Sequence, residues 1–135
     1  MRVAVRRVEA PGDDVRALNR LCFRDDPVNW RAATWWAASF GDDLVAFAGI
    51  EPHKRRTWYL SRAGVHPNAR GLGLQRRLIR VREAHARRHG AVQVISDTAR
   101  WNCASANNLI ACSYRLYRPR SPWGLAGSLY FRKSL

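Results

Sequence analysis

The sequence predicts a single α/β domain of the α+β type, with a mixed, mostly antiparallel central sheet flanked by helices. The chain of 135 residues has the length of one domain, and a domain of this size buries about two-thirds of the surface of its unfolded form. Short apolar runs with strand patterns alternate with segments of helical periodicity. Because no repeat, linker or low-complexity tract interrupts the sequence, we expect residues 1–135 to form one domain.

The first half predicts a strand, a helix and a hairpin. Apolar and polar residues alternate over residues 1–7, which indicates a strand. A helix follows, capped by Asp13 or Asp14. Apolar runs at 34–40 and 44–51 flank Gly41-Asp42-Asp43, the composition of a hairpin turn. The apolar residues at helical spacing in the first helix are Val15, Leu18, Leu21 and Cys22.

The second half continues with alternating strands and helices. A strand at 57–65 ends before Pro67, because proline cannot continue a central ladder. A helix at 72–89 has one apolar face and Gly90 as its C-cap. An apolar run at 91–96 predicts a buried strand, and a helix at 102–112 follows. Strands at 114–118 and 128–133, joined by a connection rich in proline and glycine, complete the order β-α-β-β-β-α-β-α-β-β.

The turn before the second helix, Arg70-Gly71-Leu72-Gly73-Leu74-Gln75-Arg76, is the most informative segment. Glycine lets the backbone approach a ligand, and the first N–H groups of a helix point toward an anion. A dinucleotide motif fails because Arg76 takes its third glycine position. A triphosphate loop fails because Gln-Arg-Arg replaces Gly-Lys-Ser/Thr. The alternatives left are a phosphate-binding turn, which we favour, and a turn that only starts a helix.

With a later segment, this turn resembles the GNAT superfamily of acyl-CoA N-acetyltransferases. The family turn has the pattern Gln/Arg-x-x-Gly-x-Gly/Ala, and its fixed places are taken here by Arg70, Gly73 and Gln75. The family's later element, Asn-x-x-Ala/Ser closing on Gly-Phe, matches Asn102, Ser105 and the pair Ser113-Tyr114. Gln75 departs from the family's small residue, and Ser113 stands where the family has glycine. Only these two segments are specific.

The resemblance implies a GNAT-like domain that binds acetyl-CoA between two neighbouring strands in the splayed middle of the sheet. The pyrophosphate would lie on the glycine turn, the pantetheine along the strand that ends at Val65, and a main-chain N–H there could polarise the thioester carbonyl. Asn102 would bind pantetheine amides and also cap its helix. The expected coenzyme-binding residues are Ala63, Gly64, Val65, Arg70, Gly71, Leu72, Gly73, Leu74, Gln75, Arg76, Asn102 and Ser105.

The expected catalytic residues are Asp97, Glu51 and Tyr117. Asp97 ends a buried strand five residues before the helix start and matches the acidic residue of ribosomal-protein N-terminal alanine acetyltransferases. Apolar walls would raise its pKa and make it the general base. The alternative role of Asp97 is to cap the following turn, and Glu51 is the rival base. Those enzymes carry a tyrosine where Leu109 stands here. Tyr114 or Tyr117 would then be the acid, or the thiolate would leave without one.

The charge and the cysteines test other classes of function. The formal net charge is +14, and all 24 basic residues except Lys54 and Lys133 are arginines. This balance suits nucleic acid, but the arginines are spread over every expected element and no nucleic-acid-binding motif accompanies them. Three cysteines without Cys-x-x-Cys spacing predict no disulfide framework and no metal site, and we expect them to be buried. His85 and His89 share a helix face that we expect to be solvated.

The predicted partners are acetyl-CoA and an unidentified primary amine of a small molecule or protein, with a homodimer left open. The acceptor site would be built from residues 23–33 and 119–127, whose Trp30, Trp123, Asp25 and Asp26 would either meet the amine or be ordinary loop residues. No run of about 18 apolar residues and no signal-like N-terminus is present, so we expect a cytoplasmic protein without membrane contact. The alternatives are an acyl-CoA-binding protein without catalysis and, less favoured, a basic nucleic-acid-binding module.

Overall fold

The computed structural model describes residues 2–135, and its elements follow the predicted order. Met1, the first residue of the expected N-terminal alternation, lies outside the described residues. The elements are β1 (Ala4–Val8), α1 (Asp13–Phe23), β2 (Thr34–Phe40), β3 (Asp43–Pro52), β4 (Thr57–Val65), η1 (Pro67–Ala69), α2 (Leu74–Arg88), β5 (Gln93–Ala99), α3 (Cys103–Ala111), β6 (Arg115–Tyr117) and β7 (Ser128–Ser134).

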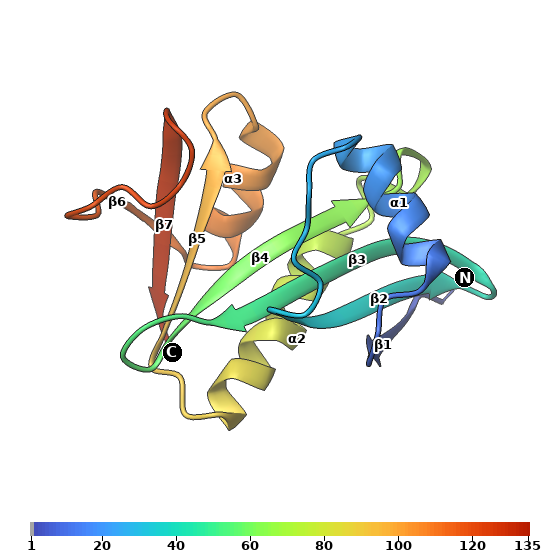
Figure 1. Cartoon of the computed structure of the whole chain (residues 1–135), viewed down its shortest axis with the longest axis horizontal. Coiled ribbons are helices and arrows are strands. Elements are labelled where there is room, and N and C mark those ends of the chain that lie inside the picture. Colours follow the sequence, from blue (N-terminus) through green and yellow to red (C-terminus); the bar gives the residue numbers. More distant parts are fainter. Residues whose placement is uncertain (1) are drawn as a thin grey trace.

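All seven strands form one sheet in the order β1-β2-β3-β4-β5-β7-β6. Every neighbouring pair is antiparallel except β4 and β5, which are parallel because α2 crosses over between them. The mixed, mostly antiparallel sheet is therefore confirmed. Figure 1 shows α1 in front of the sheet and α2 behind it.

The two faces of the sheet have separate hydrophobic cores. The larger core includes Ile50, Leu60 and Phe131 of the sheet together with Leu78 of α2 and Leu109 of α3. The smaller core lies under α1, where Val15 and Leu18 pack with Trp35 and Phe47. Because successive side chains of a strand point to opposite faces, Phe47 and Ile50 of β3 lie on opposite faces. Helices therefore cover both faces of the sheet.

The parallel pair β4 and β5 is joined only at its beginning. Thr57 to Tyr59 pair with Gln93 to Ile95, and among the described residues no later pair joins the two strands. Beyond this point β4 stays with β3 and β5 stays with β7. A bulge in β4 bends the strand away, because Ala48 pairs with Ala63 whereas Ile50 pairs with Leu60. The two strands separate toward their C-terminal ends (Figure 1).

Several boundaries differ from the predicted ones. Helix α2 begins at residue 74 rather than 72, because Gly71 and Gly73 have φ values of 80° and 77°, and Gly90 follows the C-cap residue instead of being it. Strand β5 covers residues 93–99 rather than 91–96, since the chain first extends away from α2. Gly12, and neither Asp13 nor Asp14, is the N-cap of α1.

Burial also corrects four predictions. Leu21 points away from the core and is 56% exposed. Cys103 is exposed and Cys22 half-buried, so only Cys112 has the expected burial. His85, expected on a solvated face, is buried between Trp36 and Trp58.

Across residues 2–135, every helix is too short or too polar to cross a membrane.

Candidate active site

The glycine turn follows β4 and the short helix η1 and leads directly into α2. Gly73 is the N-cap of α2 and is a residue without a side chain, so it leaves the first N–H groups of the helix uncapped. Within residues 2–135, no atom lies within 4 Å of the place where a Cβ on Gly71 or Gly73 would stand. The first turn of α2 contains no acidic residue. The turn is open, electropositive and able to accept an anion.

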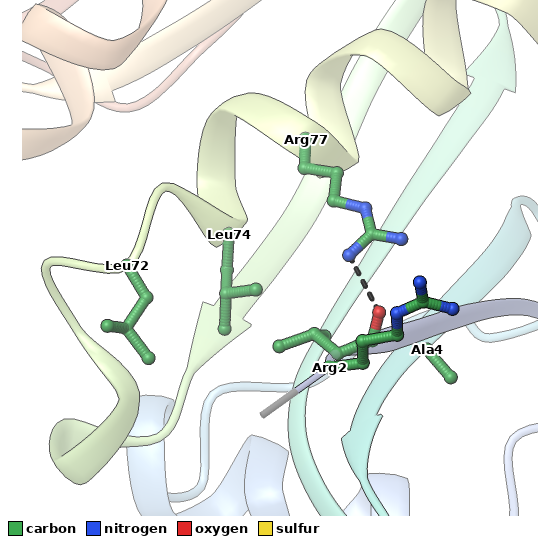
Figure 2. Close-up of a pocket in the computed structure, with 6 residues that line it drawn as sticks. Arg2, Ala4, Leu72, Leu74 and Arg77 are labelled. Atoms are coloured by element: carbon green, nitrogen blue, oxygen red, sulfur yellow. Dashed lines mark hydrogen bonds between the residues drawn. The ribbon is translucent and has the colours of Figure 1, made fainter.

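The arginines around this turn have different tasks. Arg76 Nε donates to Asn108 Oδ1 at 3.1 Å and links α2 to α3, while Arg70 is exposed. Arg77 donates to the Val3 carbonyl at 2.8 Å (Figure 2), across a cavity of about 690 Å³ that lies between α2 and the first strand. Arg82 is 2% exposed and donates to the carbonyl of Gly49 at 2.9 Å. Arg82 therefore supports the sheet and does not belong to a basic surface.

The coenzyme-binding residues predicted on β4 and α3 flank the separation of β4 and β5. Ala63, Gly64 and Val65 lie beyond the last β4–β5 pair and are bound on their other side to β3. A Cβ on Gly64 would stand 2.6 Å from the Phe47 ring, so this position is a glycine because the smaller core approaches it closely. Asn102 is the N-cap of α3, and its side chain accepts from the N–H of Ser105 at 3.1 Å. The predicted capping role of Asn102 is confirmed.

The two predicted carboxylates lie on one face of the sheet, where β4 and β5 begin to separate. Asp97 follows the last paired residue of β5 by two positions, and Glu51 is directly opposite Tyr59 in the β3–β4 ladder. The hydroxyl of Tyr59 donates to Asp97 Oδ1 at 2.8 Å. Burial raises the pKa of Glu51, an effect that the nearby His53 opposes. The pKa of Tyr59 is also raised, first by burial and then by Asp97 and Glu51, so its hydroxyl stays protonated.

The connection between β6 and β7 folds over Asp97. The Trp123 ring stands edge-on to the rings of Tyr59 and Tyr130, with centroids 5.2 Å and 4.9 Å away. The N–H of Gly124 donates to the Tyr130 hydroxyl at 3.0 Å. A Cβ on Gly124 would stand only 2.7 Å from Asp97 Oδ2. Asp97 is half-buried, with Tyr59 at one carboxylate oxygen and Gly124 at the other.

The other expected acceptor residues lie elsewhere. Trp30 packs on Trp35 with ring centroids 4.8 Å apart, in the smaller core. Asp26 forms an ion pair with Arg62 of β4, whose guanidinium also donates to Asn19 Oδ1 at 3.1 Å. Of the four residues suggested for the acceptor, only Trp123 lies beside Asp97.

The tyrosines expected to supply a proton are not equally placed. Tyr114 is 2% exposed and its hydroxyl donates to Glu83 Oε2 at 2.7 Å, so it does not reach the site. Tyr117 is opposite Tyr130 in the β6–β7 ladder, and Tyr130 is opposite Asp97 in the β5–β7 ladder. Tyr130 therefore separates Tyr117 from Asp97. Leu109 is buried in the larger core.

Sequence reasoning missed Tyr59, the tyrosine that does contact Asp97. No motif surrounds it, and the two residues are 38 positions apart in the chain. Only the parallel pairing of β4 with β5 brings them together.

The described residues 2–135 contain no group of three or more His, Cys, Asp and Glu side chains arranged to hold a metal ion.

Residues 8–113 match the model of the acetyltransferase (GNAT) family. The chain belongs to this family. Membership makes it an acetyltransferase, the activity that the resemblance of the glycine turn and the Asn102 segment implies. No curated protein matches the chain in sequence.

Several solved structures share the fold of this acetyltransferase. An acetyltransferase from Bacillus subtilis in complex with CoA has a TM-score of 0.84 and 13% identity, with 99% of each chain covered. A GNAT family acetyltransferase from Elizabethkingia anophelis with acetyl-CoA bound has a TM-score of 0.79 and 11% identity over 98% of each chain. The ribosomal-protein-S18-alanine N-acetyltransferase from Escherichia coli has a TM-score of 0.76 and 11% identity, covering 98% of this chain and 94% of that one.

Proposed function

We propose that this acetyltransferase moves the acetyl group of acetyl-CoA to a primary amine of a small molecule or protein. The observation that carries the proposal is the separation of β4 and β5 directly beside an uncapped, glycine-lined helix start. Where β4 and β5 separate, the main-chain N–H and C=O groups that no longer pair across the two strands need other hydrogen-bond partners. An extended pantetheine arm offers amides to such an edge, and the helix start offers N–H groups to a pyrophosphate.

The direction of the bound coenzyme follows from the order of the elements. The glycine turn comes after the C-terminal end of β4, so the phosphates lie at the wide end of the separation. The pantetheine then runs back along Val65, Gly64 and Ala63 toward Tyr59, and the thioester lies near the closed end. Asn102 and Ser105 begin the helix that follows β5, and we expect them to line the same opening.

The closed end carries the groups that acetyl transfer requires. A main-chain N–H of β4 polarises the thioester carbonyl, and such a fixed donor needs no reorganisation during the reaction. Asp97 accepts the proton that the acceptor ammonium must lose, with Glu51 as the rival base. Tyr117 remains the candidate acid for the thiolate, which can also leave unassisted. Trp123 forms one wall of the acceptor site.

The test is release of free thiol from acetyl-CoA in the presence of a panel of primary amines. We expect thiol release that depends on the amine, together with an amine product heavier by one acetyl group. Calorimetry separates the alternatives: an acyl-CoA-binding protein would bind acetyl-CoA without thiol release. A nucleic-acid-binding module would bind DNA with a steep salt dependence and would leave acetyl-CoA alone.

A further inference from the structure

We propose that Tyr59 is a catalytic residue of this enzyme, and that its hydroxyl passes the proton of the acceptor amine to Asp97. The hydroxyl donates to Asp97 Oδ1 at 2.8 Å. This role rests on the proposed acetyl transfer. It is the route by which a proton from the amine reaches Asp97, the general base of that reaction.

Both carboxylate oxygens of the half-buried Asp97 have a close neighbour. One carboxylate oxygen accepts from Tyr59, and the other lies so close to Gly124 that a Cβ there would stand 2.7 Å away. Gly124 is held in place by its hydrogen bond to Tyr130, the residue opposite Asp97 in the ladder. An acceptor amine at the closed end of the separation, where the thioester is placed, therefore lies next to the Tyr59 hydroxyl, because Tyr59 is the last β4 residue paired with β5.

The position of Tyr59 in β4 suits contact with the reacting atoms. It is the last β4 residue paired with β5, so the main chain of β4 is free of β5 from the next residue onward, in the direction of Ala63 and the pantetheine. A tyrosine hydroxyl that donates one hydrogen bond still has lone pairs with which to accept another. Tyr59 can therefore donate to Asp97 and accept from an amine nitrogen at the same time.

The proposed step moves two protons and leaves tyrosine unchanged. The amine nitrogen forms a bond to the thioester carbonyl carbon, and the carbon–sulfur bond breaks with its electron pair going to sulfur. As the nitrogen becomes an amide, its proton moves to the Tyr59 oxygen while the original hydroxyl proton moves to Asp97 Oδ1. The thiolate is the leaving group, and Asp97 later returns its proton to solvent. No oxidant or further reactant is needed.

The electrostatics favour a concerted relay over a free tyrosinate. Asp97 of β5 and Glu51 of β3 both face Tyr59 and, with burial, raise its pKa, whereas Arg62 of β4 lowers it less. A negative charge on this oxygen would stand beside two carboxylates. A hydroxyl that stays neutral while one proton arrives and another leaves avoids that charge.

Tyr59→Phe tests the role, and Tyr114→Phe is its matched control. Both variants remove a hydroxyl that donates to a carboxylate, at 2.8 Å from Asp97 and at 2.7 Å from Glu83, but Tyr114 lies in the core. We expect Tyr59→Phe to lower single-turnover acetyl transfer at neutral pH by about 100-fold to 10,000-fold, with acetyl-CoA affinity unchanged in calorimetry. Tyr114→Phe should lower the melting temperature and keep the rate.

A double variant and an isotope measurement make the test decisive. If Tyr59 and Asp97 form one relay, Tyr59→Phe with Asp97→Asn is no slower than the slower single variant, because residues that act as a unit are not additive. For the wild-type enzyme, rates in mixtures of light and heavy water should fall on a curve, which indicates two protons in motion.

Three results would overturn the relay. These are a near-normal rate for Tyr59→Phe, rate losses that multiply in the double variant, or a linear isotope plot. If instead the wild-type enzyme binds acetyl-CoA but acetylates no amine, the proposed function fails and the relay with it. Failure of the relay alone leaves wild-type transfer intact, so the two failures are distinguishable.

Discussion

Replacing Gly73 with alanine separates the coenzyme-binding role of the turn from its structural role. The residue has a φ of 77° and, among residues 2–135, no atom lies within 4 Å of its Cβ position. Gly90 has a φ of 83° and the same open surroundings, but it lies at the other end of α2. Gly90→Ala is therefore a control with the same backbone conformation and no expected contact with the coenzyme.

The two variants should lose similar stability. A left-handed backbone is unfavourable for a residue with a Cβ by about 1–2 kcal/mol, and the lower chain entropy of alanine in the unfolded state returns about 0.5–1 kcal/mol. The free energy of unfolding should therefore fall by about 1 kcal/mol in each variant. For a domain of this length, the melting temperature falls by about 4 °C.

Only Gly73→Ala should weaken coenzyme binding, because its methyl group occupies the space through which phosphate oxygens approach the helix N–H groups. We expect at least about a tenfold loss of acetyl-CoA affinity by calorimetry, or about 1.4 kcal/mol, and no change for Gly90→Ala. Equal affinities in two folded variants would remove the turn from the coenzyme site.

Three further predictions concern other positions. Ser113 has a φ of 74° where the family has glycine, so Ser113→Gly should stabilise the fold by about 0.5 kcal/mol, measured by urea unfolding. Burial lowers the pKa of His85 from 6.5 to about 4, and the positive charges of His89, Arg7 and Arg88 add to this effect. As the pH falls, the unfolded chain binds a proton at this histidine before the folded chain does, so the free energy of unfolding should decrease between pH 6.5 and pH 4. Thermal melts of His85→Phe should lack that decrease. Gly124→Ala forces Asp97 or the Trp123 connection to move, so turnover should fall while acetyl-CoA affinity stays the same.

Most of the fold was predictable because its signals are local. The hairpin turn after residue 40, the glycines before α2 and the Asn102 cap each determine structure within a few residues. The helix start and the burial that were predicted wrongly depend on backbone conformations and on contacts between strands that are distant in the sequence. The left-handed backbone conformations of Gly71 and Gly73 delay the start of α2, and burial of His85 follows from two tryptophans, one on β2 and one on β4.

The candidate site was predictable only where a motif marks it. The glycine turn and Asp97 could be named from spacing and resemblance, whereas Tyr59, Trp123 and Gly124 come from three segments that meet only in the folded sheet. Burial of Arg82 under the sheet was likewise not predictable, because an arginine on a helix is ordinarily exposed.

The most direct test of the account is a crystal structure of the enzyme with CoA. We predict that the pyrophosphate accepts hydrogen bonds from N–H groups of residues 71–75, and that the pantetheine lies against residues 63–65 with its sulfur toward Tyr59. Pyrophosphate held by the side chains of Arg2 and Arg77 in the cavity of Figure 2, with no hydrogen bond from the N–H groups of residues 71–75, would contradict both the assigned turn and the direction of the coenzyme.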